Sequence, residues 1–527
     1  MESPIKLRLY TLHDYILDIS YRCPDKDAVI FHDKRYKYSE LVKASLALSH
    51  YLRNVINTIK GDRVLILAKN SPEHIIAVLG CMFSGCIYVP VNHNIRIDKL
   101  TYILGDIRPK VIITDWRMDS GLKELIRTSN ITSDIISLEE ANGKVINGDP
   151  RHRFFSIIDA GTNYFDGSII DRDIACVIYT SGSSGFPKGV VLSHLNMLTA
   201  ATSIISYLDL SSDDVIMCTL PLSFDYGMYQ YLMSLLLGAA LVLEDSFVFV
   251  GDIITSLVNN KCTVFPVIPS MISILIKKGP LSEDSTDSIR IVTNTAARLE
   301  KNHINYIMEN FRKARIFSMY GLTECKRVSY LPPEEIVRRG DSVGKGMPNQ
   351  EIFLVDADMN RLPNGTTGQL VVRGSHVMRG YWGNPAETGK FLKKLAGVDD
   401  VALHTGDIFR SDEDGYLYFI GRNDDIIKTY GEKVSPREIE KTINSMDGIL
   451  ESAAVGVPDP VAGNIFFLYF SVKPGFICTE EQVMAYCRMH LEPHVVPKKV
   501  IILDELPKSD NGKIDKKQLL NDHVNQS

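Results

Sequence analysis

Residues 179–189 read Tyr-Thr-Ser-Gly-Ser-Ser-Gly-Phe-Pro-Lys-Gly, and this stretch decides how the rest of the chain is interpreted. Apolar runs at 174–178 and 190–192 flank it, which predicts a strand, a Gly/Ser loop and a second strand. Glycines let the backbone approach a ligand closely, and successive N–H groups can form an anion-binding concavity. Hydroxyls and one lysine add donors, so the loop suits a polyphosphate. The residues that we expect to bind it are Thr180, Ser181, Gly182, Ser183, Ser184, Gly185 and Lys188.

The loop is not a Walker A motif, because that motif ends in Gly-Lys-Ser/Thr and here Lys188 follows a proline. A flexible Ser/Gly linker is the plainer reading, but linkers rarely lie between two apolar strands. The stretch resembles the phosphate loop of the adenylate-forming superfamily, which includes acyl-CoA synthetases, aryl-CoA ligases, luciferases and peptide-synthetase adenylation domains. The resemblance implies that the loop holds the β- and γ-phosphates of ATP.

Length and composition favour a protein with two or more domains in the cytoplasm. A chain of 527 residues is too long to fold around a single hydrophobic core, and a net charge of −6 provides no positive field to attract nucleic acid. The longest apolar stretch, 231–243, is too short to span a bilayer and predicts a buried helix running into a strand. Nine scattered cysteines without a C-x-x-C pair favour reduced thiols and argue against a zinc site. We saw no signal peptide.

Strands alternate with helices over the first 115 residues, which predicts an α/β protein with a parallel sheet. We expect one helix to begin near Ser39, a plausible N-cap, and another to open at Ser71 and run to about Gly85. Residues 116–172 are polar and predict surface connections without an assignable function. Residues 368–422 are rich in strands and turns, which predicts a small β-rich subdomain.

The segment Leu220–Met228 resembles one wall of the acid-binding pocket of the family. At Phe224-Asp225 two readings compete. In many CoA ligases an aromatic residue or histidine gates the pocket there, whereas in amino-acid-activating relatives a Phe-Asp pair binds the α-ammonium group of the substrate. The plainer alternative is that Asp225 is a helix N-cap facing solvent or backbone N–H groups. Tyr226 and Tyr229 would line the same wall.

A second motif, Tyr320-Gly-Leu-Thr-Glu324, follows the apolar run 316–319. The resemblance implies that Tyr320 stacks on adenine beside Gly321, Thr323 reaches a phosphate and Glu324 holds Mg²⁺, and that Met319 lines the acid pocket. These residue types suit a base, a phosphate and a hard cation. The preceding turn at 293–299 flanks adenine in the family. Its residues Thr295, Ala296 and Ala297 are candidate nucleotide contacts.

That turn departs from the family pattern of two glycines, which Thr293 and Asn294 replace. Asn tolerates the left-handed conformation, so we expect the turn to survive. Lys326 and Arg327 lie near the substrate pocket in family terms. They either bind an acidic group of the substrate or carrier, or form a solvated charge pair.

The C-terminal part completes the resemblance. Asp407 and Arg422 match residues that bind the ribose and phosphate, and a boundary after residue 422 divides the chain into domains 1–422 and 423–527. Asp424 would be the hinge of a small, mobile α+β domain. A polar turn near the C-terminus projects Lys513, which matches the lysine of the adenylation step, while Lys428 would face the site during thioester formation.

The sequence therefore predicts an enzyme that activates a small carboxylic acid with Mg·ATP and passes the acyl group to a pantetheine thiol. That thiol belongs to CoA or to the phosphopantetheine of an acyl or peptidyl carrier protein. The acid is fatty or aromatic, or alternatively an amino acid held by Asp225. A non-catalytic nucleotide-binding protein and a luciferase-type oxygenase remain alternatives of a different class.

Overall fold

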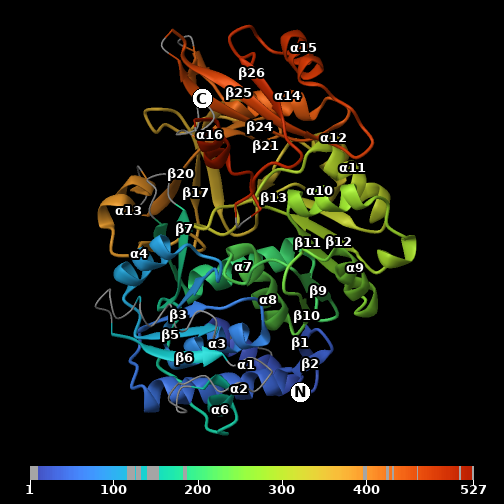
Figure 1. Ribbon diagram of the computed structural model, residues 1–527. Helices are drawn as coiled ribbons and strands as arrows, with labels where there is room; N and C mark the ends of the chain where they lie inside the picture. Colours follow the sequence, from blue (N-terminus) through green and yellow to red (C-terminus); the bar gives the residue numbers. More distant parts are fainter. Residues whose placement is uncertain are drawn as a thin grey trace.

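The structure is a computed structural model, and it describes residues 10–115, 125, 132–138, 153–181, 187–395, 400–422, 427–429, 432–459, 461–509 and 512–524. A large N-terminal domain holds three sheets, and a smaller C-terminal domain, red in Figure 1, lies at one end of it. This arrangement confirms the predicted fold class. Among the described residues, no helix is both long and apolar enough to cross a bilayer.

The first sheet carries the phosphate loop and has the strand order β18-β8-β7-β4-β3-β5-β6. Its strands β4, β3, β5 and β6 pair in parallel with one another, as the alternating pattern predicts, whereas β7 and β8 form an antiparallel hairpin. The bounds are β3 Arg63–Leu67, β4 Ile87–Val91, β5 Val111–Asp115, β6 Asp134–Leu138, β7 Ile174–Ser181, β8 Pro187–Ser193 and β18 Gly380–Tyr381.

The second sheet carries the nucleotide motif and has the order β15-β14-β13-β12-β11-β9-β10-β1-β2. Its central strands pair in parallel. The bounds are β1 Asp27–Phe31, β2 Lys34–Lys37, β9 Val215–Cys218, β10 Ala240–Leu243, β11 Val264–Val267, β12 Ile291–Asn294, β13 Arg315–Tyr320, β14 Ser329–Tyr330 and β15 Lys345–Gly346.

Helices fill the space between these two sheets and cover their outer faces, and Figure 1 shows α7 and α8 in the middle of the domain. Helices α3 and α8 are apolar on nearly every side because they are buried between layers. The helices of eight or more residues in this domain are α1 Leu12–Arg22, α2 Tyr38–His50, α3 Pro72–Ser84, α4 Ile97–Ile107, α7 His194–Leu208, α8 Asp225–Leu237, α9 Val250–Asn259, α10 Pro269–Lys278 and α11 Lys301–Asn310. Shorter helical segments are η1 Tyr51–Val55, α6 Phe154–Ile158, η3 Glu283–Ser285, η4 Pro333–Glu335, α12 Ile336–Arg339 and α13 Pro385–Phe391.

Two local predictions fare differently. Helix α3 begins where the sequence predicts, and Ser71 caps it by accepting a hydrogen bond from the backbone N–H of His74. The predicted cap at Ser39 is wrong, because α2 begins one residue earlier, at Tyr38, whose buried hydroxyl donates to the carbonyls of Ser234 and Ala239. The segment 116–172 is more than surface connections, since it supplies strand β6 of the first sheet.

The predicted β-rich subdomain is a five-stranded sheet of β16 Glu351–Val355, β17 Thr367–Arg373, β19 Leu392–Lys394, β20 Val401–Ser411 and β21 Leu417–Arg422. The C-terminal domain has a hairpin, β22 Ile427–Thr429 with β23 Glu432–Val434. It also has a sheet of β24 Ile449–Asp459, β25 Gly463–Val472 and β26 Lys499–Ile502. Helices α14 Pro436–Asn444, α15 Glu480–His490 and α16 Lys516–Val524 complete it. Its apolar core includes Ile439, Leu468 and Val483 and is distinct from that of the N-terminal domain.

Candidate active site

The phosphate loop connects β7 to β8, and its two arms are in register, with Thr180 opposite Lys188 and Ser181 opposite Pro187. Gly182, Ser183, Ser184 and Gly185 lie outside the described residues. The ammonium of Lys188 forms an ion pair with Glu387 of α13, whose other carboxylate oxygen accepts from Lys390. These two lysines hold the pKa of Glu387 below its usual value. Lys188 is thus already oriented at the base of the loop by a carboxylate that a phosphate group can replace.

Glu324 lies in the loop that follows β13, close to the same hairpin. Its carboxylate accepts a hydrogen bond of 2.8 Å from the Tyr381 hydroxyl of β18, which pairs with β8. Within the described part of the chain, no three His, Cys, Asp or Glu side chains are grouped to hold a metal ion. A single carboxylate beside a phosphate-binding loop nevertheless fits Mg²⁺, which takes most of its ligands from phosphates and water.

Tyr320, Asp407 and Arg422 meet at the junction of the second sheet with the β-rich sheet. The Tyr320 hydroxyl donates to one oxygen of Asp407, and Arg422 donates to the other at 3.0 Å. Asp407 is 2% exposed, and burial raises the pKa of this carboxyl although Arg422 opposes the shift. Burial, and then the charge of Asp407, raises the pKa of Tyr320. An aromatic face beside a carboxylate that can accept two O–H groups suits a nucleoside.

The turn after β12 survives the loss of its two glycines, but not in the way that the sequence predicts. The residue with a left-handed backbone is Ala296, with φ of 73°, and not Asn294. Asn294 instead ends β12 and donates its side-chain amide to the Ala297 carbonyl at 2.9 Å. Thr295 follows it and is buried.

The predicted acid pocket is built on the first turns of α8. Phe224 is its N-cap and packs partly buried against the core, while Tyr226 and Tyr229 are fully buried. Tyr226 donates to the Thr293 carbonyl at 3.0 Å. Met319, at the end of β13, accepts from the Tyr207 hydroxyl at 2.9 Å.

Asp225 is neither a solvent-facing cap nor a free carboxylate. It is the first residue of α8, its side chain caps no backbone N–H, and it lies 3.7 Å from the Lys326 ammonium. Lys326 and Arg327 are 4% and 2% exposed, so the prediction of a solvated charge pair is wrong. Gly321 makes this burial sterically feasible, because a Cβ there would overlap the Lys326 carbonyl oxygen.

Lys513 stands on a hairpin near the end of the chain. The Ser509 N–H donates to the Lys513 carbonyl at 2.7 Å, and Gly512 has φ of 71°. Asp510 and Asn511 of the predicted turn lie outside the described residues. Lys513 keeps contact with solvent, and the surrounding protein lowers the pKa of its ammonium, opposed by the charge of Asp225. The charges of Arg422 and Arg437 lower the pKa of Lys513 further, and the charge of Asp407 raises it. Lys513 is therefore close enough to the predicted nucleotide and acid sites to be affected by their charges.

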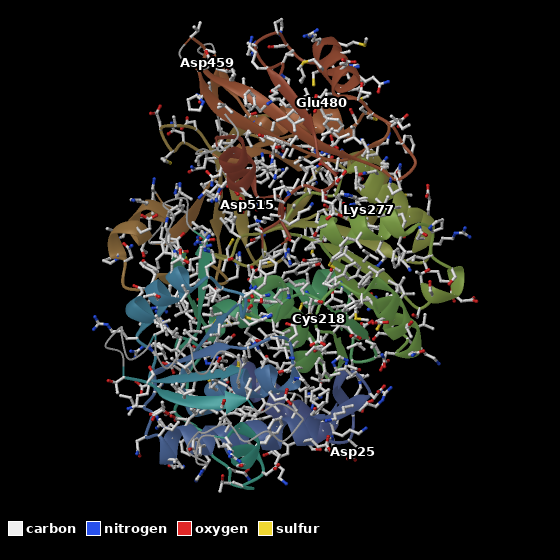
Figure 2. The ribbon with its side chains drawn as sticks, viewed as in Figure 1. Asp25, Cys218, Lys277, Asp459, Glu480 and Asp515 are labelled. Atoms are coloured by element: carbon white, nitrogen blue, oxygen red, sulfur yellow. The ribbon has the colours of Figure 1, made fainter. Side chains whose placement is uncertain are left out.

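This hairpin is docked on the N-terminal domain through α10 and its N-cap Ile268. A Cβ at Gly512 would overlap Ile268 and Ser270, so glycine allows the close approach. Lys508, on the same hairpin, pairs with Glu451 of β24 at 2.5 Å, and Glu451 accepts from Ser273 of α10 at 3.0 Å. Figure 2 labels Asp515 beyond the hairpin and Lys277 on α10, which pairs with Glu505.

Other predicted residues are placed less completely. Thr323 lies half-buried in the loop between β13 and β14, next to Glu324. Lys428 belongs to β22, but its side chain is outside the described residues, as is the whole of the predicted hinge, Asp424.

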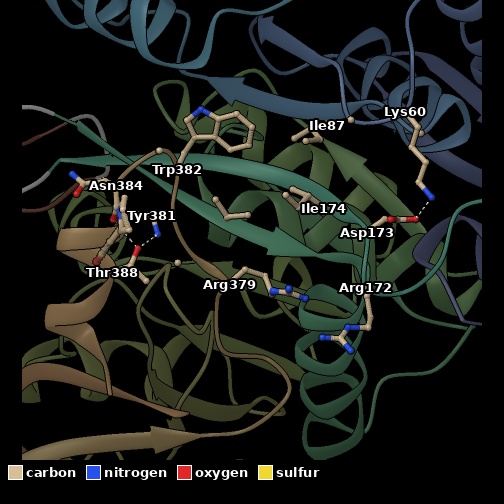
Figure 3. Close-up of a pocket in the computed structure, with 16 residues that line it drawn as sticks. Lys60, Ile87, Arg172, Asp173, Ile174, Arg379, Tyr381, Trp382, Asn384 and Thr388 are labelled. Carbon is tan, nitrogen blue, oxygen red and sulfur yellow. Dashed lines mark hydrogen bonds and ion pairs between the residues drawn. The ribbon is translucent and has the colours of Figure 1, made fainter. Parts of the chain in front are cut away.

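A groove of about 890 Å³ lies away from the predicted site, at the N-terminal ends of β3, β4 and β7 (Figure 3). Arg172, Arg379 and Trp382 are among its lining residues, and Lys60 there pairs with Asp173 at 2.5 Å. Tyr381 also borders this groove, so the strand β18 separates it from Glu324.

Sequence reasoning missed two contacts of the site. Tyr381 and Glu387 contact Glu324 and Lys188 from positions 57 and 199 residues further along the chain. The sequence places both in or beside the β-rich region, and only the Gly-Tyr-Trp run at 380–382 hinted at a fixed position.

Comparison with known proteins agrees with this geometry. The chain matches the family described as AMP-binding enzyme over residues 18–382, and its C-terminal domain over residues 438–513. It is 28% identical to a long-chain-fatty-acid–CoA ligase of Salmonella typhimurium, covering 94% of this chain and 92% of that protein. It is 27% identical to part of a linear gramicidin synthase of Brevibacillus parabrevis, covering 94% of this chain and 6% of that protein.

Among solved structures, ATP-bound MatB from Rhodopseudomonas palustris superposes with a TM-score of 0.86 at 25% identity, covering 98% of this chain and 99% of that one. The family match spans more than half of the chain, and both of its domains occur here in order. The chain therefore belongs to the AMP-binding enzyme family, as an AMP-forming acid–thiol ligase.

Proposed function

We propose that this protein joins a small carboxylic acid to coenzyme A in two steps that share one site. The observation that carries the proposal is that Lys513, the last motif of the sequence, has among its charged neighbours, besides Arg437 of α14, the motif residues Asp225, Asp407 and Arg422. These three residues are 91 to 288 positions before Lys513 in the chain, and each matches a motif of the family. A site assembled from such distant segments supports a single reaction centre.

In the first step, one oxygen of the acid attacks the α-phosphorus of ATP and the bond to pyrophosphate breaks. The acid is ionised near neutral pH, so no general base is required. The protein positions the reactants and neutralises the charge that develops. Lys513 would bridge the acid and α-phosphate oxygens, while Lys188 and the phosphate loop would hold the departing pyrophosphate.

Mg²⁺ would be held by Glu324, where it would neutralise phosphate charge. Tyr381 orients that carboxylate through its hydrogen bond. Tyr320 would stack on adenine, and Asp407 and Arg422 would bind the ribose. Thr323, Thr295, Ala296 and Ala297 would complete the nucleotide contacts.

In the second step, a thiol attacks the acyl carbon and AMP departs with the oxygen that the acid contributed. We propose that the C-terminal domain, residues 423–527, turns about Asp424 between the steps and brings Lys428 to the site. The CoA ligases among the relatives support CoA as the acceptor. The match to a gramicidin synthase keeps a carrier protein as the second candidate.

An amino acid as substrate is the weaker alternative. Asp225 would have to bind the α-ammonium group, but it already neighbours the Lys326 ammonium at 3.7 Å. We also place the enzyme in the cytoplasm, a proposal that rests on nine cysteines, all of them free.

The test is release of pyrophosphate from Mg·ATP across fatty, aromatic and amino acids, without an acceptor thiol. We expect release with one chemical class, followed by thioester formation when CoA is added. Hydrolysis of ATP that no acid stimulates would contradict the proposal. Thioester formation on a carrier protein but not on CoA would replace the acceptor and leave the first step intact.

A further inference from the structure

Two adjacent cations are buried beside the first turn of α8. Lys326 donates to the Asp225 backbone carbonyl at 2.8 Å, and its ammonium lies 4.5 Å from the centre of the Tyr229 ring. The Arg327 guanidinium lies 5.6 Å from the centre of the Tyr226 ring. Burial this complete is rare for either residue type unless a charge partner is present.

Arg327 has no acidic side chain in contact with it among the described residues. Asp225 is the acidic partner of Lys326, and it is 3.7 Å away. Within the described part of the chain, Arg327 forms no ion pair, and its buried Nε has no hydrogen-bond partner. Burial lowers the pKa of Lys326 to about 7, so the Arg327 guanidinium is the group that keeps its full charge here. A buried guanidinium without an acidic partner and with an unpaired Nε is strongly unfavourable.

The groups around Arg327 cannot supply the missing negative charge. The Tyr226 hydroxyl donates to Thr293, and burial raises the pKa of that hydroxyl above its usual value, so it stays neutral. Tyr207 donates to Met319, and burial raises the pKa of its hydroxyl to about 12. The surroundings of Arg327 are thus an aromatic wall whose hydroxyls are neutral.

The backbone of the loop that carries Lys326 and Arg327 has an unfavourable conformation at Lys326. Lys326 has φ of 60°, which a residue with a side chain rarely adopts. Such conformations persist where the surrounding structure enforces them, and they gather at functional sites. Here the left-handed residue comes two positions after Glu324, the candidate metal ligand, and directly before Arg327.

We infer that the acid activated by this enzyme carries a second anionic group, a carboxylate or a similarly compact oxyanion, which binds to Arg327 with Lys326 beside it. This inference rests on the proposed function. Asp225 is a charged neighbour of both Lys513 and Lys326, so the place proposed for the distal anion adjoins the place proposed for the reacting carboxylate. A short or medium-length dicarboxylic acid has this distribution of charge.

The test uses acids of equal length that differ only at the far end. Butyrate, 4-aminobutyrate and succinate form one set, and hexanoate, 6-aminohexanoate and adipate form another, within a series of three to eight carbons. Pyrophosphate release with Mg·ATP gives kcat/KM for each acid. We expect the dicarboxylate of the best length to exceed its monocarboxylate by about a hundredfold, as for a bidentate charged pair.

Variants assign the preference to a residue. Arg327→Met should lower the ratio of kcat/KM for the dicarboxylate to kcat/KM for the monocarboxylate about a hundredfold, whereas Arg327→Lys should retain part of the preference. Arg339→Met is the matched control, because Arg339 is an arginine with a largely covered side chain that pairs with Asp412 and Asp414 outside the site. Calorimetric binding of the dicarboxylate to the unmodified enzyme gives a second readout that needs no folded variant.

The outcomes separate the two proposals. Pyrophosphate release with monocarboxylates or amino acids at least as efficient as with dicarboxylates would overturn this inference and leave the adenylation chemistry standing. An unchanged preference in Arg327→Met would also overturn it. Release with fatty or aromatic acids but with no dicarboxylate of the series would likewise overturn only this inference. Absence of acid-stimulated release with the series and with the fatty, aromatic and amino acids, with ATP bound, would instead contradict the proposed function.

Discussion

Replacing Lys513 with alanine should abolish most of the first half-reaction while sparing the fold. Lys513 keeps contact with solvent at the tip of its hairpin, so an effective dielectric constant of about 20 applies between its ammonium and an anion. At about 4 Å, one unit charge then contributes about 4 kcal/mol, which agrees with the effect of removing one donor from a preorganised site. That free energy corresponds to a loss of about a thousandfold in rate.

The assay is pyrophosphate release with saturating ATP and the best acid, compared with Lys499→Ala, an exposed lysine of β26. The free energy of unfolding of each variant should lie within about 0.5 kcal/mol of that of the unmodified protein, as for other surface substitutions. Thioester formation from a supplied acyl-adenylate should change little, because Lys513 acts in forming the bond between the acid and the α-phosphorus, and the acyl-adenylate already contains that bond. A Lys513→Ala variant that releases pyrophosphate at a near-normal rate would refute this assignment.

Three further predictions follow from the contacts of the site. Glu387→Gln should lower KM for ATP about fivefold, since Lys188 no longer has to leave a carboxylate; an unchanged or raised KM would contradict this. Asp407→Asn should raise KM for ATP at least tenfold, whereas Tyr320→Phe, which keeps the ring, should raise it less; equal effects would argue against a ribose contact. Burial lowers the pKa of His303 to about 3, so the unfolded state binds the proton first as pH falls below about 6.5. Because of His303, the free energy of unfolding should therefore fall by about 2 kcal/mol between pH 7 and pH 5. In His303→Gln, the free energy of unfolding measured by denaturant titration should depend less on pH over this range.

The strands, helices and motif order could be predicted because they depend on local signals. Ser71 precedes an apolar helix and caps it, and Gly85 ends that helix with φ of 73°. Ser39 has the same local signal, yet the helix begins at Tyr38, because that residue is buried and bonds to carbonyls some 200 residues away. Tertiary contacts overrode the local preference there.

Partners of the site residues could not be predicted in the same way. Tyr381 belongs to β18, the edge strand beside β8 in the first sheet, and Glu387 belongs to α13, but no pattern in the sequence links them to Glu324 or Lys188. The burial of Arg327 is equally invisible in the sequence, because a Lys-Arg pair after a turn usually faces solvent. The close approach of the backbone at Gly321 and the fit of α8 against the loop decide it.

The most direct measurement follows an oxygen atom. Each acid of the series would be supplied with both carboxylate oxygens as ¹⁸O, together with Mg·ATP and CoA, and the products would be analysed by mass spectrometry. If the acid attacks the α-phosphorus, we expect one ¹⁸O in AMP, unlabelled pyrophosphate and one ¹⁸O in the thioester. Unlabelled AMP, or ADP in place of AMP, would contradict adenylation as the chemistry of this site.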